Sequence, residues 1–297
     1  MKRAATSRGG WTRRLVSCLW LAPLLVPVGV AQAHGDEHAR IEALGRRIAA
    51  EPDNVPWRLR RAELLRSHHQ WADAEADLNR VRELVAGTPV GTQVWRLPLA
   101  RLRLDQGRPA DALALLEPPS DANSEPLDGS DEAGLRLHLR AQALSALGRY
   151  TEAAALRAAR VAMLNAPEVG DYLDWADEAA RAGDPAASLR ALDAGLERLG
   201  PLVVLQRRAV ELAQAQHRWP EALARLAPLL ETSPRKEGLW LWRAQIERRA
   251  GLPAQALTSL AEAAAALDRL PPAQSGTTAM ASLRTQIEAE RRLVETR

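Results

Sequence analysis

One short phrase recurs along this sequence and constrains its fold more than any other feature: glycine, any residue, then an aromatic residue or proline. Its clearest copy lies between Leu147 and Ala153, with Gly148 and Tyr150 at the two marked places. Glycine favours the left-handed backbone that ends a helix, and a small residue such as Ala153 lets a second helix approach closely. The phrase therefore predicts two helices joined by a tight turn. The other five copies, in which His sometimes replaces Gly, begin at His68, Gln106, Ala182, Gln216 and Ala250.

Two sets of small residues keep the same phase as the turns. One set, early in each second helix, is Ala74, Ala112, Ala153, Ser188, Ala222 and Ala256, in steps of 38, 41, 35, 34 and 34 residues. The other set, ahead of each turn, is Ala62, Ala100, Ala141, Ala176, Val210 and Ala244. The chain is rich in the helix formers Ala, Leu, Arg and Glu and poor in β-branched residues, so the units predict an all-α protein.

A period near 34 residues with this turn phrase resembles the tetratricopeptide repeat (TPR) family. The resemblance covers the chain from about Asp36 to the C-terminus. It implies an all-α fold, a right-handed α-solenoid of antiparallel helix pairs, with about six TPR-like repeats, an N-terminal half-repeat near Ile41 and a C-terminal capping helix. The predicted segments are repeats at 55–88, 93–120, 134–167, 169–200, 203–235 and 237–270, an acidic, proline-rich loop at 117–131 and a cap helix at 279–295.

Large side chains occupy two places in these units. The aromatic residues that follow three of the turns, Trp71, Tyr150 and Trp219, are expected to be buried at the helix joints. The family's large apolar position early in the first helix is matched by Trp57, Trp95, Leu137, Tyr172, Leu205 and Trp240.

The first 33 residues differ in character from the rest. A basic start without acidic residues is followed by an apolar run from Leu15 to Val30, and Ala31 and Ala33 place small residues where a signal peptidase cleaves. This order predicts a signal peptide at residues 1–33, cleaved after Ala33. The part that follows, residues 34–297, is then expected to be periplasmic or secreted.

Two further features of the leader bear on membrane anchoring and on the export route. An uncleaved anchor is disfavoured because the apolar run is interrupted by Pro23 and Pro27 and is shorter than the ~20 residues that span a bilayer. No integral membrane span is therefore expected after cleavage. The pair Arg13 and Arg14 leaves both the general secretory route and the twin-arginine route open.

Cleavage would change the charge balance. Five of the 40 basic residues and none of the 37 acidic residues precede His34, so the remainder carries 35 basic and 37 acidic residues, a net charge of −2. No basic field is left for nucleic acid, which we do not expect as a partner. The one cysteine, Cys18, lies in the leader, so disulfides and thiolate metal sites are excluded from the exported part.

No catalytic motif occurs in the sequence. It lacks Gly-x-Ser-x-Gly, a phosphate-binding glycine loop and His-Glu-x-x-His. Acid pairs such as Asp73 and Asp77 have the spacing of a helix face, which predicts solvated surface carboxylates. We therefore expect no enzymatic activity and no cofactor.

A metal-handling protein is the alternative to a binding scaffold. If cleavage follows Ala33, His34 becomes the N-terminus, and its free amine and imidazole could chelate one metal ion, with His38 four residues further on. Nitrogen ligands of this kind suit copper, nickel or zinc.

The resemblance implies that the first helices line a concave groove that binds an extended peptide or helix of another protein. The groove positions mix both charges, and they lack the Lys/Asn pattern of the subfamily that clamps a terminal carboxylate. Arginines among them could pair with carboxylates in a fork geometry. We therefore predict a non-enzymatic protein–protein interaction scaffold or adaptor. Its predicted groove residues are Glu63, Arg66, Arg101, His138, Gln142, Asp177, Arg181, Arg207, Glu211, Gln214, Gln245 and Arg248.

Overall fold

The computed structural model describes residues 28–87, 94–117 and 131–296, with side chains from Glu37 onward. Most of the predicted signal peptide and nearly all of the predicted loop at 117–131 lie outside these residues. The helices are α1 (Val28–Ala50), α2 (Val55–Ser67), α3 (Trp71–Leu84), α4 (Arg96–Asp105), α5 (Pro109–Leu116), α6 (Asp131–Ala146), α7 (Tyr150–Met163), α8 (Val169–Arg181), α9 (Pro185–Leu199), α10 (Val203–Ala215), α11 (Trp219–Thr232), α12 (Glu237–Arg249), α13 (Pro253–Asp268), α14 (Pro272–Ser275) and α15 (Thr278–Glu295).

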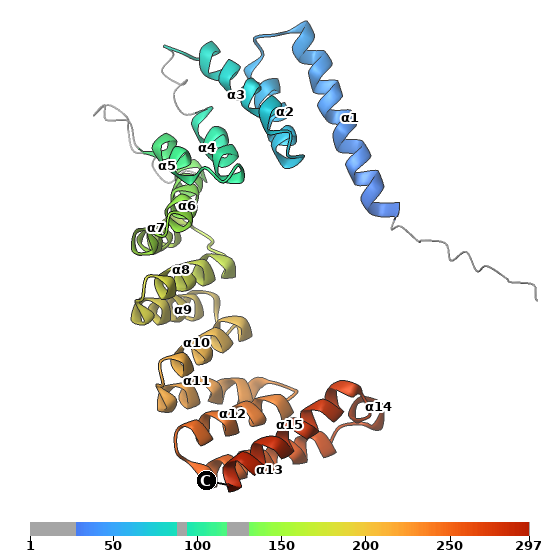
Figure 1. Ribbon diagram of the computed structural model, residues 1–297, viewed down its shortest axis with the longest axis vertical. Coiled ribbons are helices and arrows are strands. Elements are labelled where there is room, and N and C mark those ends of the chain that lie inside the picture. The colour runs from blue at the N-terminus through green and yellow to red at the C-terminus, as the bar shows by residue number, and fades with distance from the viewer. Residues whose placement is uncertain (1–27, 88–93, 118–130, 297) are drawn as a thin grey trace, which may run out of the picture.

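Consecutive helices from α2 to α13 form six antiparallel pairs, and each pair packs against the next. The pairs follow one another along a crescent, with α1 at one end and α15 near the other (Figure 1). The described part of the chain contains helices and no strands. The predicted all-α solenoid of helix pairs is thus confirmed.

Local sequence signals set where many of these helices begin. Asn54 and Asp184 each accept a hydrogen bond from a backbone amide in the first turn of α2 and α9, at 3.2 and 2.8 Å. Such caps satisfy amides that have no partner inside the helix. The prolines of three turn phrases, Pro109, Pro185 and Pro253, are the first residues of their helices, where a missing N–H costs nothing.

The turns adopt the backbone that the phrase predicts. Gly107, Gly148, Gly183 and Gly251 have φ between 69° and 76°. His69 and His217, which stand where other units have glycine, adopt the same left-handed conformation with φ of 58° and 57°. The six copies of the phrase therefore share one backbone shape, and His replaces Gly at some cost in backbone strain.

The two sets of small residues are buried, each to 2% exposure or less. They lie where the two helices of a pair meet. In the fourth unit the contact includes a hydrogen bond, because the Ser188 hydroxyl donates to the Ala176 carbonyl at 2.7 Å. Close approach of paired helices, as the sequence predicted, is therefore a general feature of the array.

The prediction that the turn aromatics are buried was wrong. Trp71, Tyr150 and Trp219 are each half-buried. Each is the first residue of a second helix, where neighbouring helices cover only one side of a side chain. The largest fully buried side chain is Tyr172 of α8, which is 1% exposed and packs with Leu205 of the next unit.

The two ends of the array are covered by single helices. The predicted half-repeat helix near Ile41 is part of α1, which is continuous from Val28, so the predicted cleavage point after Ala33 falls inside this helix. At the other end α15 packs on α13 and α12 and buries Ile287 and Val294. None of the described helices is long and apolar enough to cross a membrane.

Candidate protein-binding surface

The predicted groove residues lie on the first helices of the pairs, α2, α4, α6, α8, α10 and α12. At the N-terminal end, three of these predicted residues form hydrogen bonds or ion pairs with one another. Arg66 of α2 donates to Glu63 at 2.8 and 3.0 Å and is also paired with Asp105 of α4. Arg101 of α4 lies 3.5 Å from Glu63. The hydrogen bonds from Arg66 outweigh burial and lower the pKa of Glu63, so this end of the face is internally neutralised.

In the middle of the array, His138 of α6 helps to join α6 to α7. Its Nδ1 accepts a hydrogen bond of 2.8 Å from Arg157 of α7, which is buried and also pairs with Asp174 of α8 at 3.1 Å. Burial first, then the charges of Arg157 and Arg160, lower the pKa of His138. His138 is therefore half-buried and already bonded, whereas Gln142 on the same helix is exposed.

The two predicted residues of α8 differ in how closely they are bonded to neighbouring side chains. Asp177 accepts a hydrogen bond of 2.6 Å from Arg208 of α10. Arg181 is exposed and makes only long contacts, 3.5 Å to Ser145 and 3.4 Å to Glu178. Arg181 is therefore the one predicted residue of α8 whose charge faces solvent largely uncommitted.

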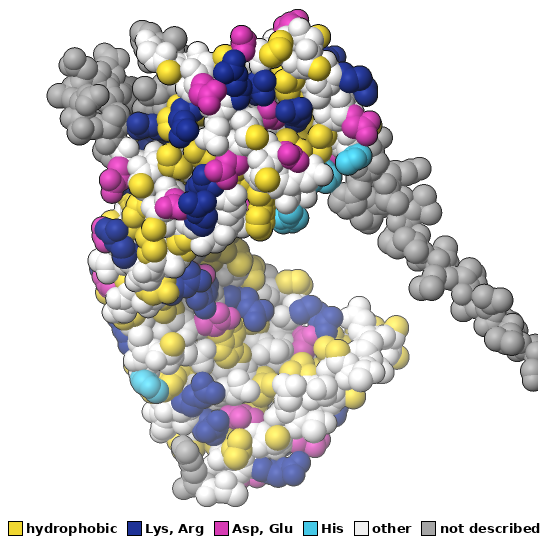
Figure 2. Space-filling view, turned by 45° about the horizontal axis from the view of Figure 1, so that its top comes forward, with side chains coloured by type: hydrophobic (Ala, Val, Ile, Leu, Met, Phe, Trp, Pro, Cys, Tyr) yellow, Lys and Arg dark blue, Asp and Glu magenta, His cyan; other side chains and the backbone are white. Residues whose placement is uncertain are grey.

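At the C-terminal end the face is hollowed. A first hollow of about 590 Å³ is lined by residues of α10, α12 and α15 and by the end of α11. A second hollow of about 670 Å³ lies between the turn ends of α10 and α12. Glu211 lines both, so the two adjoin and we call them together the double hollow. Figure 2 shows the hollowed side of the crescent, where basic, acidic and hydrophobic side chains are mixed.

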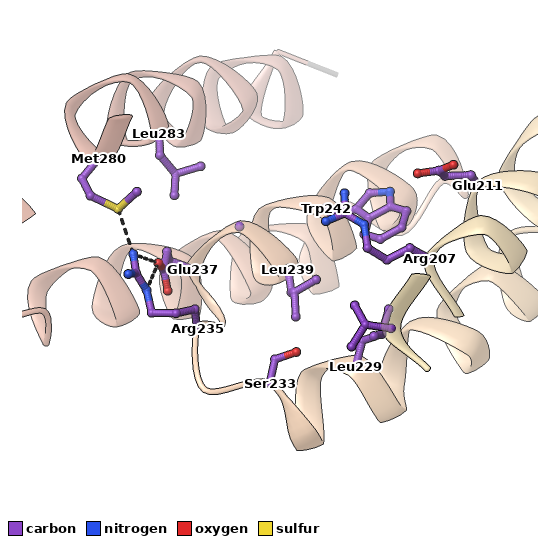
Figure 3. A pocket seen from close by; sticks show the side chains of 12 residues that line it. Arg207, Glu211, Leu229, Ser233, Arg235, Glu237, Leu239, Trp242, Met280 and Leu283 are labelled. Carbon is purple, nitrogen blue, oxygen red and sulfur yellow. Dashed lines mark hydrogen bonds and ion pairs between the residues drawn. The ribbon is translucent and has the colours of Figure 1, made fainter. Parts of the chain in front are cut away.

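Trp242 of α12 organises the double hollow. Its Nε1 donates a hydrogen bond of 2.7 Å to Gln214 of α10, and the Arg207 guanidinium lies 5.5 Å from the centre of its ring. A cation over an indole face is attracted by the ring quadrupole, which favours this position of the Arg207 side chain. Figure 3 shows the two side chains stacked at the end of the first hollow nearest Glu211.

The opposite end of the first hollow is mainly apolar and contains one ion pair whose two charges compensate each other. Leu239 of α12 and Met280 and Leu283 of α15 line it (Figure 3). Arg235 donates to Glu237 at 2.5 Å and contacts the Met280 sulfur at 3.3 Å. Burial pushes the pKa of Glu237 upward, but the hydrogen bonds from Arg235 and the backbone outweigh it, so the net shift is downward. This carboxylate is ionised and already satisfied.

Two cations along the double hollow have no such partner. Glu211 is paired with Arg208 at 3.6 Å, and Arg248 with Glu290 of α15 at 2.5 Å. Within the described residues, Arg207 makes a cation–π contact with Trp242 but no ion pair or hydrogen bond, and Arg249 makes no ion pair or hydrogen bond. The lining therefore carries two uncompensated positive charges.

Arg207, Glu211, Gln214 and Arg248 are the predicted groove residues that the structure brings together here, and the half-buried Gln245 lies on the same helix as Arg248. The sequence analysis missed Trp242, whose signal was a second tryptophan two places after Trp240. It also missed the contribution of α15. No sequence pattern indicated that contribution, because it arises from a helix that folds back across the preceding unit.

Both histidines of the predicted N-terminal metal site lie in α1. No group of three or more His, Cys, Asp or Glu side chains suited to a metal ion occurs in the described residues. His38 is exposed, and the side chain of His34 lies outside the described part of the chain. The N-terminal chelate stays a prediction.

No protein-family model matches the sequence, and no curated protein matches it. Solved structures do resemble it. A tetratricopeptide repeat protein from Parabacteroides merdae is 16% identical over 86% of this chain and 94% of its own, with a TM-score of 0.45. YrrB, a TPR protein with an unusual peptide-binding site, is 13% identical over 77% of this chain and 94% of its own, with a TM-score of 0.39. The APC/C hetero-tetramer Cut9–Hcn1 is 12% identical over 88% of this chain and 48% of its own, with a TM-score of 0.44.

The chain's own geometry characterises the fold. Six turns share one left-handed backbone position, and small buried residues recur on both sides of each joint. Among the described residues, the main contacts of each helix pair are with its neighbours along the array, as in solenoid proteins. The described part of the chain is therefore an α-solenoid of antiparallel helix pairs.

Proposed function

We propose that this protein is a non-enzymatic scaffold that holds a segment of another protein against the C-terminal part of its first-helix face. The double hollow carries this proposal. It is concave, each of its two parts falls within the ~300–1,000 Å³ of typical ligand sites, and its charges are only partly satisfied. The N-terminal part of the same face is internally neutralised. Binding is thus concentrated on α10, α12 and α15.

Site-specific photo-crosslinking in the native host tests this proposal. A photoreactive residue replaces Val203, which lines the first hollow and is 53% exposed. The matched control replaces Leu257, an exposed apolar residue of the second helix α13. We expect protein adducts from position 203 and not from position 257. Adducts of equal yield at both positions, or none at 203, would refute the scaffold function on this face.

The proposed place of action is the periplasm. Support comes from the leader of residues 1–33 and from the absence of cysteine after Cys18. N-terminal sequencing of the protein isolated from its host, after separation of periplasm from cytoplasm, tests this. An intact leader on cytoplasmic protein would contradict export.

A further inference from the structure

The charges of the double hollow indicate which kind of segment it takes. Glu237 is paired with Arg235, and Glu211 lies 3.6 Å from Arg208, which also bonds Asp177. The lining itself carries four arginines and two glutamates, namely Arg207, Arg235, Arg248 and Arg249 with Glu211 and Glu237. The guanidinium groups of Arg207 and Arg249 have no carboxylate partner among the described residues. The unmet charge is therefore positive, and it calls for an anionic group on the partner.

The position of Arg207 favours direct binding of a carboxylate over a general attraction to negative charge. Its guanidinium lies over Trp242, 5.5 Å from the ring centre, and makes no hydrogen bond to a protein acceptor in the described residues. A planar guanidinium held this way presents its N–H groups in a fork that matches a carboxylate, and stacking on an aromatic ring leaves that fork free.

The apolar lining adds a second requirement. Val203, Leu239, Met280 and Leu283 line the first hollow together with Arg207, and Met280 and Leu283 lie at the end away from it. Val203 and its neighbour Val204 remain 53% and 48% exposed, although valine is more often buried than left in water. An apolar side chain of the partner would remove this surface from water.

We propose that the double hollow binds an acidic amphipathic segment of a partner protein. An apolar side chain of the segment enters the apolar end of the first hollow, and carboxylates further along the segment, toward the second hollow, meet Arg207 and Arg249. This inference rests on the proposed function and specifies the chemistry of the partner. Since both arginines are accessible to solvent, salt screens the contacts, and affinity falls as ionic strength rises.

Three fluorescein-labelled helical peptides of equal length test the proposal by fluorescence anisotropy with the purified full-length protein. The first carries leucines flanked by glutamates, the second has lysine for glutamate, and the third has serine for leucine. We expect the first peptide to bind about tenfold tighter or more than either of the others, a difference of about 1.4 kcal/mol.

Charge-reversal variants connect that preference to the site. Arg207→Glu and Arg249→Glu should each weaken binding of the first peptide by about tenfold or more. Arg190→Glu is the matched control, because Arg190 is exposed on the second helix α9 and lies 3.7 Å from Asp184. Circular dichroism and urea unfolding confirm that each variant is folded.

The outcomes separate this inference from the scaffold function. Preference for the first peptide, lost in Arg207→Glu and Arg249→Glu and kept in Arg190→Glu, supports it. Equal or tighter binding of the lysine peptide overturns the acidic preference and leaves a scaffold of other specificity. Binding that survives both reversals overturns the site. Binding of none of the peptides overturns the inference, while crosslinking at Val203 decides the scaffold function separately.

Discussion

His138 illustrates how a side chain with a predicted binding role can be committed to the fold. Arginine only donates hydrogen bonds, so Nδ1 of His138 must accept from Arg157, and the ring is neutral with its proton on Nε2. Arg157 and Arg160 of α7 and Asp171 and Asp174 of α8 surround it. Burial and the two arginines together outweigh the two aspartates and lower the pKa of His138.

Stability should therefore depend on pH through this residue. The unfolded chain protonates His138 as the pH falls through about 6.5, while the folded chain keeps it neutral to a lower pH. The contribution of His138 is fully present above pH 6.5, and it is lost as the pH falls from there toward the folded pKa. We expect His138→Gln, which keeps an acceptor for Arg157, to reduce the fall in urea midpoint between pH 7.5 and pH 5.

The matched control is His38→Gln, which makes the same replacement at an exposed residue of α1. Each variant is compared with the wild type at every pH, so that other titrating groups cancel. If His138→Gln and the wild type lose the same stability over this pH range, the buried histidine does not carry the pH dependence.

Asp77 shows the same limit of sequence reasoning. Its spacing from Asp73 predicts a solvated carboxylate, and this prediction was wrong. Asp77 is 1% exposed and accepts hydrogen bonds from Arg58 and Arg61 of α2 at 2.6 to 2.8 Å. A helix-face pattern identifies which side of a helix a residue lies on, but not what covers that side.

At the scale of elements, one glycine marks a close approach between helices. An added Cβ at Gly195 of α9 would lie 2.9 Å from both Tyr172 Cγ and Leu205 Cδ1. We expect Gly195→Ala to lower the free energy of unfolding by about 1–3 kcal/mol, because overpacking forces the tyrosine and leucine aside. Urea unfolding at pH 7.5 measures it.

Gly170→Ala, in the first turn of α8, is the control. A Cβ there has nothing within 4 Å, and alanine favours a helix over glycine by up to ~1 kcal/mol. Its stability should match or exceed that of the wild type. Equal stability of Gly195→Ala and wild type would mean that the two units separate slightly without cost.

The sequence predicted helix pairs and turns well because these are local. A left-handed turn is encoded in four neighbouring residues, and His69 and His217 could be placed in it by phase alone. The double hollow is not local. Arg207 meets Trp242 from the next unit, and Arg248 meets Glu290 of α15, and no spacing rule within one unit reports such contacts.

Across the whole molecule, the junction between the first and second pairs differs from the others. Helix α3 packs only lightly on α4. Exposed or half-buried ion pairs supplement this contact, including Arg103 with Glu75 at 2.5 and 2.7 Å and Arg101 with Glu63 at 3.5 Å. An exposed pair such as Arg101 with Glu63 contributes little, about 0–1 kcal/mol, and salt weakens it.

We therefore expect α2 and α3 to open before the rest of the array. Hydrogen exchange followed by mass spectrometry should give lower opening free energies for 55–84 than for 169–232, where Tyr172 and Leu205 bridge two units. Raising NaCl from ~0.05 to ~0.5 M should widen that difference. Uniform exchange along the array, or no effect of salt on the difference, would contradict this view of the junction.

By itself the sequence determined that this chain is an all-α array of six helix pairs. It also placed the turns and the small residues at which the paired helices meet. Those properties repeat with the period of the chain and depend on residues within one unit. Only the tertiary structure decided which polar residues remain available for a partner. Arg66, Asp177 and Arg248 form ion pairs with residues of other units or of α15, whereas Arg207 and Arg249 form none among the described residues. The difference arises because ion pairing depends on how neighbouring units are stacked, which no single repeat encodes.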